Sequence, residues 1–472
     1  MGVIPSPAGR GLLSRRRWAG GVCLAVFVTA CASHADSSAS PLSPPRAGEV
    51  GLVEVPAQAD GAPYATRMFY AFRPSDDVSP DLPLLVVFNG GPEACTTCLL
   101  AGLGTGPYTI DPSLPVESPL TRNDASWTRF ANLLYVDERQ AGFSYGLGTP
   151  PTAPCAYDSW GDAADYLRVV LWFLDAHAEY THRKVVFVGE SYGGTRASLM
   201  LYLLLHPGGP EAQHAGVGQL IASHLANAGV SDATVQFVGA ALLEPLLAGG
   251  TQVDLSQAMA MQAGLPPLVD DTRDADGVGL YRILLPRIFS ALGDEAMSTT
   301  LFGVDLGTLS TLRATARKNA FRLPNDGLTM PQKLTQALEG SLESRWGPLA
   351  AGDAYFVPAP LGCVYDVTSI GDFGRAQFLD VAQRVRVFIT NAKFDTIVYG
   401  PSIAPALSDA ETEVTVRDTG APVYQQLVIH DTSGAASDRV IPFVAYDAGH
   451  MIEVSQPEKL AGDLENWLAG RL

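Results

Sequence analysis

Residues 185–205 read VVFVGESYGGTRASLMLYLLL, and this stretch decides the fold class. Residues 185–188 are apolar and rich in β-branched side chains, which indicates a short buried strand. Residues 197–205 are mostly apolar and indicate a helix. Between them, Gly189-Glu190-Ser191-Tyr192-Gly193 fits the G-x-S-x-G pattern of a nucleophile on a sharp strand-to-helix turn. The alternative is an ordinary Gly/Ser turn, but the flanking strand and helix favour Ser191 as a nucleophile.

Further apolar runs outline the rest of the sheet. Residues 82–88 and 131–137 are two such runs, and the first stops abruptly at Asn89-Gly90-Gly91-Pro92. The remaining expected elements are strands at 385–390 and 443–446, helices at 159–180 and 458–472, and an N-terminal hairpin at 51–56 and 67–73. Strands that alternate with helices predict the α/β class, here an α/β-hydrolase with a mainly parallel sheet flanked by helices.

The predicted organisation has five parts. They are a signal peptide (1–30), a flexible tether (31–50), the first part of the core (51–245), a mostly helical cap insertion (246–360) and the second part of the core (361–472). The tether is expected because its residues are rich in Ser, Pro and Ala and lack an apolar period. The cap is expected because residues 280–292, 306–321 and 332–345 have helical spacing.

The N-terminal segment has the features of an export signal. Arg15-Arg16-Arg17 precedes an apolar run, residues 22–30, that is too short for a stable membrane span. The run ends in Val28-Thr29-Ala30-Cys31, which resembles the bacterial lipoprotein signal, in which the cysteine is lipidated. We therefore expect an exported protein that Cys31 anchors to a bacterial membrane, facing the periplasm or the exterior. A simple cleaved signal is the alternative, and both the Sec and the twin-arginine routes remain open.

Composition excludes one class of partner. The chain has 472 residues, of which 47% are hydrophobic, so it has ample material for a buried core. Its formal net charge of -18 at pH 7 repels phosphate backbones, and we expect no nucleic-acid partner. The oligomeric state stays open.

Four cysteines remain beyond Cys23 in the signal and Cys31 at the predicted lipid site. They are Cys95, Cys98, Cys155 and Cys363. In an oxidising setting they are candidates for two disulfides, with three possible pairings. Cys95-x-x-Cys98 alone also fits redox or metal chemistry, but no second pair or nearby histidine supports that interpretation.

A serine nucleophile needs a base and an orienting acid, in the chain order Ser, acid, His for this fold. His450 follows a short apolar strand and precedes the last helix, so it is the predicted base. His430, in front of a turn, is the alternative. Asp395 follows the strand VRVFIT and is the predicted acid, although an exposed turn aspartate would look the same.

The intermediate of acyl transfer also needs two donors for its oxyanion. The backbone N–H of Tyr192, after the nucleophile, is one candidate. The turn after strand 82–88 can supply the other, most simply from Gly91. This chemistry uses no metal ion and no organic cofactor.

Several long segments together resemble the serine carboxypeptidases. They are FNGGP (88–92), NDASWTRFANLLYVDERQAGFSYG (123–146), GESYGG (189–194), FDTIV (394–398) and DAGHMIEVSQPEKL (447–460). The resemblance implies the triad Ser191, Asp395 and His450, with oxyanion donors Gly91 and Tyr192. It also implies that Asn89 and Glu190 bind the C-terminal carboxylate of a peptide substrate, and that Cys95 or Cys98 pairs with Cys363. The implied activity is removal of C-terminal residues through an acyl-enzyme.

Three departures from the family pattern affect this expectation. Glu93 stands where the family turn continues with glycine, and a second acidic residue is missing from residues 103–107 (LGTGP). The segment DERQAGFS (137–144) is one residue short and nearer to prolyl and tripeptidyl aminopeptidases. Our hypothesis is that Glu93 restores the missing carboxyl. An aminopeptidase, esterase or acyltransferase with the same triad, or a non-catalytic surface lipoprotein, remains the alternative.

Overall fold

The structure is a computed structural model that describes residues 45–58, 62–91, 95–97, 100–149, 155–265, 280–321, 363–365, 374–421, 423–434 and 437–472. These residues all fall within one unit, Pro44–Leu472. Several predictions lie outside the described residues, namely the signal peptide, most of the tether, Cys31, Glu93, Cys98 and the helix at 332–345.

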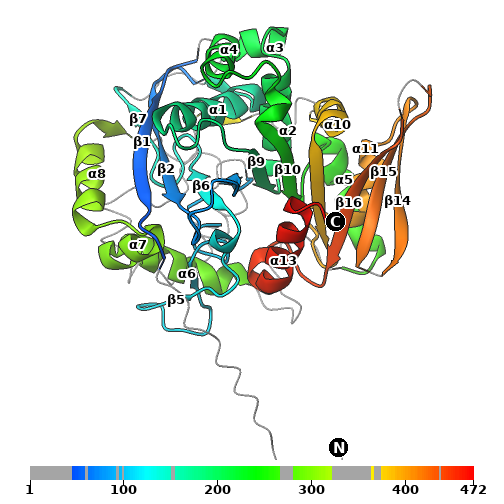
Figure 1. The fold of residues 1–472 in the computed structure, drawn as a ribbon. Helices are drawn as coiled ribbons and strands as arrows, with labels where there is room; N and C mark the ends of the chain where they lie inside the picture. Colours follow the sequence, from blue (N-terminus) through cyan, green and yellow to red (C-terminus); the bar gives the residue numbers. More distant parts are fainter. Residues whose placement is uncertain are drawn as a thin grey trace, which may run out of the picture. The chain divides into compact units, whose positions relative to one another are not determined.

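A 12-stranded sheet forms the centre of this unit and runs from β1 on the left to β14 on the right of Figure 1. Its strands are β1 (Glu49–Val55), β2 (Thr66–Arg73), β3 (Leu84–Phe88), β6 (Asn132–Val136), β7 (Tyr145–Leu147), β9 (Val185–Glu190), β10 (Phe237–Leu243), β11 (Ala320–Phe321), β13 (Arg386–Ala392), β14 (Thr412–Ala421), β15 (Tyr424–Asp431) and β16 (Arg439–Tyr446). The strand order is β11-β7-β2-β6-β3-β9-β10-β13-β16-β15-β14, and β1 pairs with β2. Two short pairs lie outside it, β4 (Tyr108–Ile110) with β5 (Leu120–Arg122) and β8 (Cys155–Tyr157) with β12 (Cys363–Tyr365).

The six central strands, from β6 to β16 in that order, are parallel, and antiparallel strands complete both ends. Successive residues of β3 are all buried but alternate between two hydrophobic cores, because Leu84 and Val86 face one layer of helices and Leu85 and Val87 face the other. A strand that is buried on both faces reads as a continuous apolar run, which is why the central strands are visible in the sequence.

Helices cover both faces of the sheet. The helices are α1 (Ser159–Ala176), α2 (Gly193–Leu205), α3 (Pro210–His214), α4 (Gly218–Asn227), α5 (Gly249–Gln262), α6 (Leu280–Gly293), α7 (Glu295–Phe302), α8 (Leu306–Asn319), α10 (Arg375–Arg384), α11 (Ile403–Leu407), α12 (Ile452–Ser455) and α13 (Pro457–Leu468). Side chains of α1, α2, α4, α10 and α11 fill one core, and those of α6, α7, α8, α12 and α13 fill the other. The predicted α/β class with a mainly parallel sheet is therefore correct.

Most predicted elements are present, with shifts of a few residues at their ends. The first hairpin is β1–β2, and β1 begins at Glu49, so the last residues assigned to the tether already pair in the sheet. The described residues of the predicted cap contain the helices α5 to α8 and the short strand β11. The pattern does not predict β10 (FVGAALL), because its glycine and alanines are weak strand formers and leave an ambiguous apolar run.

The topology brings distant parts of the sequence to one edge of the sheet. Strands β3, β9, β10, β13 and β16 are parallel neighbours, so their carboxyl ends meet at that edge. The residues directly after these strands are Asn89, Ser191, Glu244, the turn that holds Asp395, and the loop that holds His450. This edge is where a site of the predicted kind should lie.

Candidate active site

Ser191 occupies the sharp turn between β9 and α2. Its φ of 58° is in the left-handed region, where a non-glycine residue is strained by about 1–3 kcal/mol. Backbone bonds hold the turn in place, because Ser191 N–H donates to the Leu243 carbonyl over 2.9 Å and the Ser191 carbonyl accepts from Gly194 and Leu246 N–H. A Cβ on Gly189 would lie 2.2 Å from the Gly193 carbonyl oxygen, so the first glycine of the motif is sterically required. The predicted elbow geometry is present.

His450 and Asp395 meet at the same edge of the sheet. The distance from His450 Nδ1 to Asp395 Oδ2 is 2.7 Å, and both side chains are buried. Asp395 Oδ1 also accepts from the N–H groups of Ile397 and Val398, over 2.8 and 3.0 Å. Because an acceptor carboxylate holds the proton on Nδ1, Nε2 is the basic nitrogen of the neutral imidazole. The structure thus brings together the acid and the base that the sequence predicts, at the edge of the sheet where Ser191 lies.

Three other histidines lie in pairs elsewhere in the molecule. His430 Nδ1 lies 2.6 Å from Asp438 Oδ1 on the exposed hairpin of β15 and β16, so His430, the alternative base, pairs with an acid other than Asp395. His206 pairs with Asp380, and His224 lies between Asp175 and Gln236. These three histidines lie away from the ends of β9 and β13.

The turn after β3 packs directly against the elbow. A Cβ on Gly90 would lie 2.5 Å from the backbone nitrogen of Tyr192 and 2.8 Å from Ser191 Cβ, so only glycine fits there. Gly91 follows with a φ of 104° and is exposed. The two segments that were predicted to supply oxyanion donors are therefore adjacent, with Gly90 as the point of contact.

Asn89 and Glu190 form a buried pair beside the nucleophile. Asn89 Nδ2 donates to Glu190 Oε2 over 2.5 Å, and both side chains are almost fully buried. Burial raises the pKa of Glu190 from 4.5 to about 7, while the charge of His450 lowers it and that of Asp395 raises it. Near neutral pH this carboxyl therefore changes between an acceptor and a donor of hydrogen bonds.

A buried ionic network, which the sequence does not predict, supports the Asn89 turn. Arg196 on α2 lies 2.7 Å from Asp162 and 2.6 Å from Glu138, and all three side chains are fully buried. Its Nη1 donates to the backbone carbonyl of Asn89. A lone arginine in the apolar stretch TRASLMLYLLL was the available signal, because an arginine buried in a helix requires acidic partners.

Two further buried carboxyls lie near His450 and are also absent from the predictions. Glu244, after β10, has a φ of 39°, and its Oε1 accepts from the Thr390 hydroxyl over 3.1 Å. Glu453, at the start of α12, is 1% exposed, and its carboxyl oxygens have no hydrogen-bond partner among the described residues. Burial raises the pKa of both groups well above the usual range, helped by the charges of neighbouring carboxyls including Glu190.

Three of the four candidate disulfide cysteines, Cys95, Cys155 and Cys363, are among the described residues. Cys95 is in a disulfide. Cys155 and Cys363 occupy opposite positions of the parallel pair β8–β12. The pairing of the four cysteines stays a prediction, as do Cys98 and Glu93, which lie outside the described residues.

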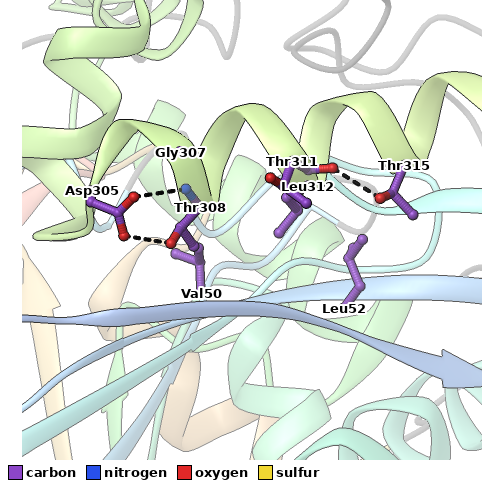
Figure 2. Close-up of a pocket in the computed structure, with 8 residues that line it drawn as sticks. All are labelled: Val50, Leu52, Asp305, Gly307, Thr308, Thr311, Leu312 and Thr315. Atoms are coloured by element: carbon purple, nitrogen blue, oxygen red, sulfur yellow. Dashed lines mark hydrogen bonds between the residues drawn. The ribbon is translucent and has the colours of Figure 1, made fainter.

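A separate groove lies between α8 and β1, away from this edge of the sheet (Figure 2). It has a volume of about 560 Å³, and its lining includes Val50, Leu52, Leu312 and three threonines. Asp305 in its wall accepts hydrogen bonds from Thr308 at the start of α8. None of its lining residues is a predicted site residue.

The described residues contain neither a metal-binding cluster nor a membrane-spanning helix. No group of three or more His, Cys, Asp or Glu side chains could hold a metal ion in the part of the chain that the structure describes. Within those same residues, no helix is long and apolar enough to cross a membrane.

Comparison with known proteins supports the motifs of the first half of the site. The sequence model of a family described as serine carboxypeptidase matches residues 47–207. Over these residues the chain is similar to the serine carboxypeptidases. The match includes the Asn89 turn and the Ser191 elbow of the carboxypeptidase-like region, whereas Asp395 and His450 lie beyond it. The second half of the triad therefore depends on the geometry described above.

Individual relatives match the same limited part of the chain. Serine carboxypeptidase-like 38 from Arabidopsis thaliana is 30% identical over 151 residues, covering 30% of this chain and 29% of the relative. Retinoid-inducible serine carboxypeptidase from Mus musculus is 30% identical over 154 residues, covering 32% and 31%. The chain thus spans less than a third of the length of these carboxypeptidases in the matches.

The structural comparison covers more of the chain. The crystal structure of Kex1Δp, a prohormone-processing carboxypeptidase from Saccharomyces cerevisiae, aligns with a TM-score of 0.52 at 15% identity. The alignment covers 90% of this chain and 92% of the other. At this identity the likeness is one of fold, and it supports the predicted α/β-hydrolase architecture on both sides of the segment 246–360.

Proposed function

We propose that this protein is a serine carboxypeptidase that removes C-terminal residues from peptides through an acyl-enzyme. The Asn89–Glu190 pair carries the proposal. Any serine hydrolase of this fold needs a nucleophile, a base and an acid, but a buried amide–carboxyl pair beside the nucleophile is suited to one further task. It can bind the terminal carboxylate of a peptide, since Asn89 offers an amide donor and protonated Glu190 offers a hydroxyl.

The catalytic cycle uses the three residues at the edge of the sheet. Ser191 Oγ attacks the scissile carbonyl and transfers its proton to His450 Nε2, while Asp395 stabilises the imidazolium through Nδ1–H. The backbone N–H of Tyr192 and a donor of the Asn89–Gly91 turn stabilise the oxyanion. His450 then protonates the leaving amine, and water hydrolyses the acyl-enzyme by the reverse sequence. No metal ion or cofactor takes part in these steps.

Carboxylate recognition should depend on pH because Glu190 titrates near neutrality. Below its pKa of about 7 the carboxyl is protonated and donates to the substrate carboxylate. Above that pH two negative charges oppose each other in a buried site, which is unfavourable. Peptide hydrolysis should therefore be strongest in mild acid.

The proposed location is outside the cytoplasm. The disulfide at Cys95 supports an oxidising compartment, and the N-terminal sequence supports export with lipidation at Cys31. The proposed organisation keeps residues 246–360 as a cap insertion, which would select the side chain of the cleaved residue.

The test uses an N-acetylated peptide with a free C-terminus and the same peptide with a C-terminal amide. We expect mass spectrometry to show stepwise loss of C-terminal residues from the free acid, slower cleavage of the amide, and no cleavage by Ser191→Ala. Ser191→Ala is expected to lower kcat on the order of 10⁴-fold or more. Cleavage only of peptides with a free N-terminus, or only of esters, would move the assignment to an aminopeptidase or an esterase.

A further inference from the structure

We propose that Arg73 and Arg46 form a binding site for a phosphate group, in a pocket between residues 45–47, β2 and α7. The pocket lies at the edge of the sheet opposite the triad. Strand β2 is antiparallel to β6, and its last residue, Arg73, pairs with Leu133 near the amino end of β6. The site is therefore separate from the active site and does not depend on the function proposed above.

The pocket is small and positively charged. Its volume is about 260 Å³. Pockets for drug-sized ligands usually measure about 300–1,000 Å³, so this one suits a small group. Among the described residues its lining contains Arg46 and Arg73 and no acidic side chain, and Tyr108 and the C-terminal end of α7 complete it. In a chain with a formal net charge of -18 at pH 7, this local excess of positive charge favours an anion.

Arg73 is the buried cation of this pocket. It is 2% exposed, and its Nε and Nη1 have no hydrogen-bond partner among the described residues. Asp76 Oδ1 also lacks a partner within those residues, so this oxygen does not pair with Arg73. Burial lowers the pKa of Arg73 to about 10, a value at which the guanidinium is still protonated near neutral pH. A buried cation without acceptors is unfavourable, and a bound anion would supply them.

Contacts between three segments hold both guanidiniums at the same pocket. A Cβ on Gly303, at the end of α7, would overlap Arg73 Nη1, so the guanidinium packs against that end of the helix. Gly48 N–H donates to the Gly303 carbonyl over 2.8 Å, and Arg46 Nη1 donates to the Ser75 carbonyl over 3.1 Å. Because a guanidinium has five N–H donors, Arg46 can bind an anion while it keeps this bond.

A phosphate group fits these donors better than a carboxylate does. The two arginines come from different segments of the chain, and the tetrahedral phosphate presents oxygens in several directions, each of which can accept charge-assisted bonds. A phosphate monoester carries a charge of about −1.5 to −2 at pH 7, which matches two arginines. The hydroxyls of Thr299 and Thr300 already donate to the Ala296 carbonyl, so the arginines are the donors.

The first experiment titrates inorganic phosphate into the protein by calorimetry, at an ionic strength held constant with chloride. We expect Arg73→Met to bind phosphate about tenfold to a hundredfold more weakly than wild type, because charge-assisted hydrogen bonds are lost. Arg46→Gln, at an exposed position, should also weaken binding, by a smaller factor. Arg384→Gln, at an exposed position of α10, is the matched control and should bind as wild type. A wild type that binds no phosphate, or equal affinity in all four proteins, would overturn the proposal.

Thermal unfolding separates a ligand-binding arginine from a structural one. In phosphate-free buffer the unpaired guanidinium of Arg73 is destabilising, so Arg73→Met should have the same Tm as wild type or a higher one. Saturating phosphate should raise the Tm of the wild type by several degrees and leave that of Arg73→Met unchanged. A variant that unfolds well below wild type in phosphate-free buffer, or fails to fold, would show that Arg73 stabilises the protein through its own contacts and would contradict the proposal.

A second ligand identifies the source of the phosphate. The predicted tether that follows Cys31 leads into residues 45–47, so a membrane phospholipid is one source and free phosphate is the other. Glycerophosphoglycerol carries the phosphodiester of a phosphatidylglycerol headgroup without its acyl chains. Tighter binding of this compound than of inorganic phosphate would assign the pocket to a lipid headgroup, and the reverse order would assign it to free phosphate. Either order supports the phosphate site, whereas binding of neither compound would refute it.

Discussion

Four buried carboxyl groups lie near His450, and Asp395 differs from the three glutamates among them. All four are buried to the same extent, but Asp395 accepts more hydrogen bonds. Asp395 is fully buried and accepts from Ile397 N–H, Val398 N–H and His450 Nδ1. The three glutamates nearby are equally buried but accept one bond or none from the described residues. The same chemical group thus has three hydrogen-bond donors at Asp395 and at most one at each glutamate, and burial raises the pKa of the three glutamates.

This contrast assigns different tasks to the two sides. A carboxylate with three donors is fixed in position and can orient the imidazole in every cycle. Buried carboxyls with one donor or none keep their protons to higher pH and can respond to an arriving charge. In the function proposed above, Asp395 acts in the chemical step, whereas Glu190 acts in binding of the substrate carboxylate. The following predictions test this division.

The largest expected effect separates Asp395 from Glu244, the two acids that follow neighbouring strands. Asp395→Asn should lower kcat/KM on the order of 10⁴-fold, because the amide no longer favours the proton on His450 Nδ1. Glu244→Gln should change kcat/KM by less than about tenfold, since Glu244 accepts from Thr390 instead. Steady-state kinetics on the N-acetylated peptide measure both. A larger loss in Glu244→Gln than in Asp395→Asn would reverse the assignment of the acid.

Local sequence was sufficient for the residues whose role depends on a turn next to an apolar strand. Ser191 has its glycines and the strand in one short stretch, and His450 follows the last strand directly. Asp395 also followed from the order of the residues in this fold. For the same reason the central strands β3, β6, β9, β13 and β16 were predictable, because burial on both faces leaves a continuous apolar run.

Residues whose role depends on contacts between distant segments were not predictable. Glu453 looks like an ordinary acidic residue in the first turn of a helix until Gly104 is seen against it. Glu244 follows β10, a strand that the pattern missed, and Arg196 gains its meaning from Asp162 and Glu138. Burial and pairing of such groups are tertiary properties, and only Arg196, as a lone arginine in an apolar helix, has a local sign of them in the sequence.

An intermediate effect is expected on the free energy of unfolding, through the buried carboxyl of Glu190. The folded chain binds the Glu190 proton more tightly than the unfolded chain, because its pKa rises from 4.5 to about 7 on folding. The free energy of unfolding should therefore fall as pH rises between these values, by roughly 3 kcal/mol from this group. Glu190→Gln should flatten this fall when wild type and variant are compared by urea denaturation at about pH 4.5 and 7.5. Parallel curves would mean that Glu190 ionises normally in the folded protein.

The smallest expected effect tests how much the hydrogen bonds between Thr390 and Glu244 contribute to the free energy of unfolding. The Thr390 hydroxyl lies 3.1 Å from Glu244 Oε1 and 3.3 Å from Glu244 N. Thr390→Val keeps the shape and removes both bonds, which should lower the free energy of unfolding by about 1–2 kcal/mol without changing kcat. Thr315→Val, at an exposed position of α8, is the control for the same chemical change and should be nearly neutral. If Thr390→Val instead lowered kcat strongly, Glu244 would act on His450 in the chemical step, and the division between the two sides of the imidazole would fail.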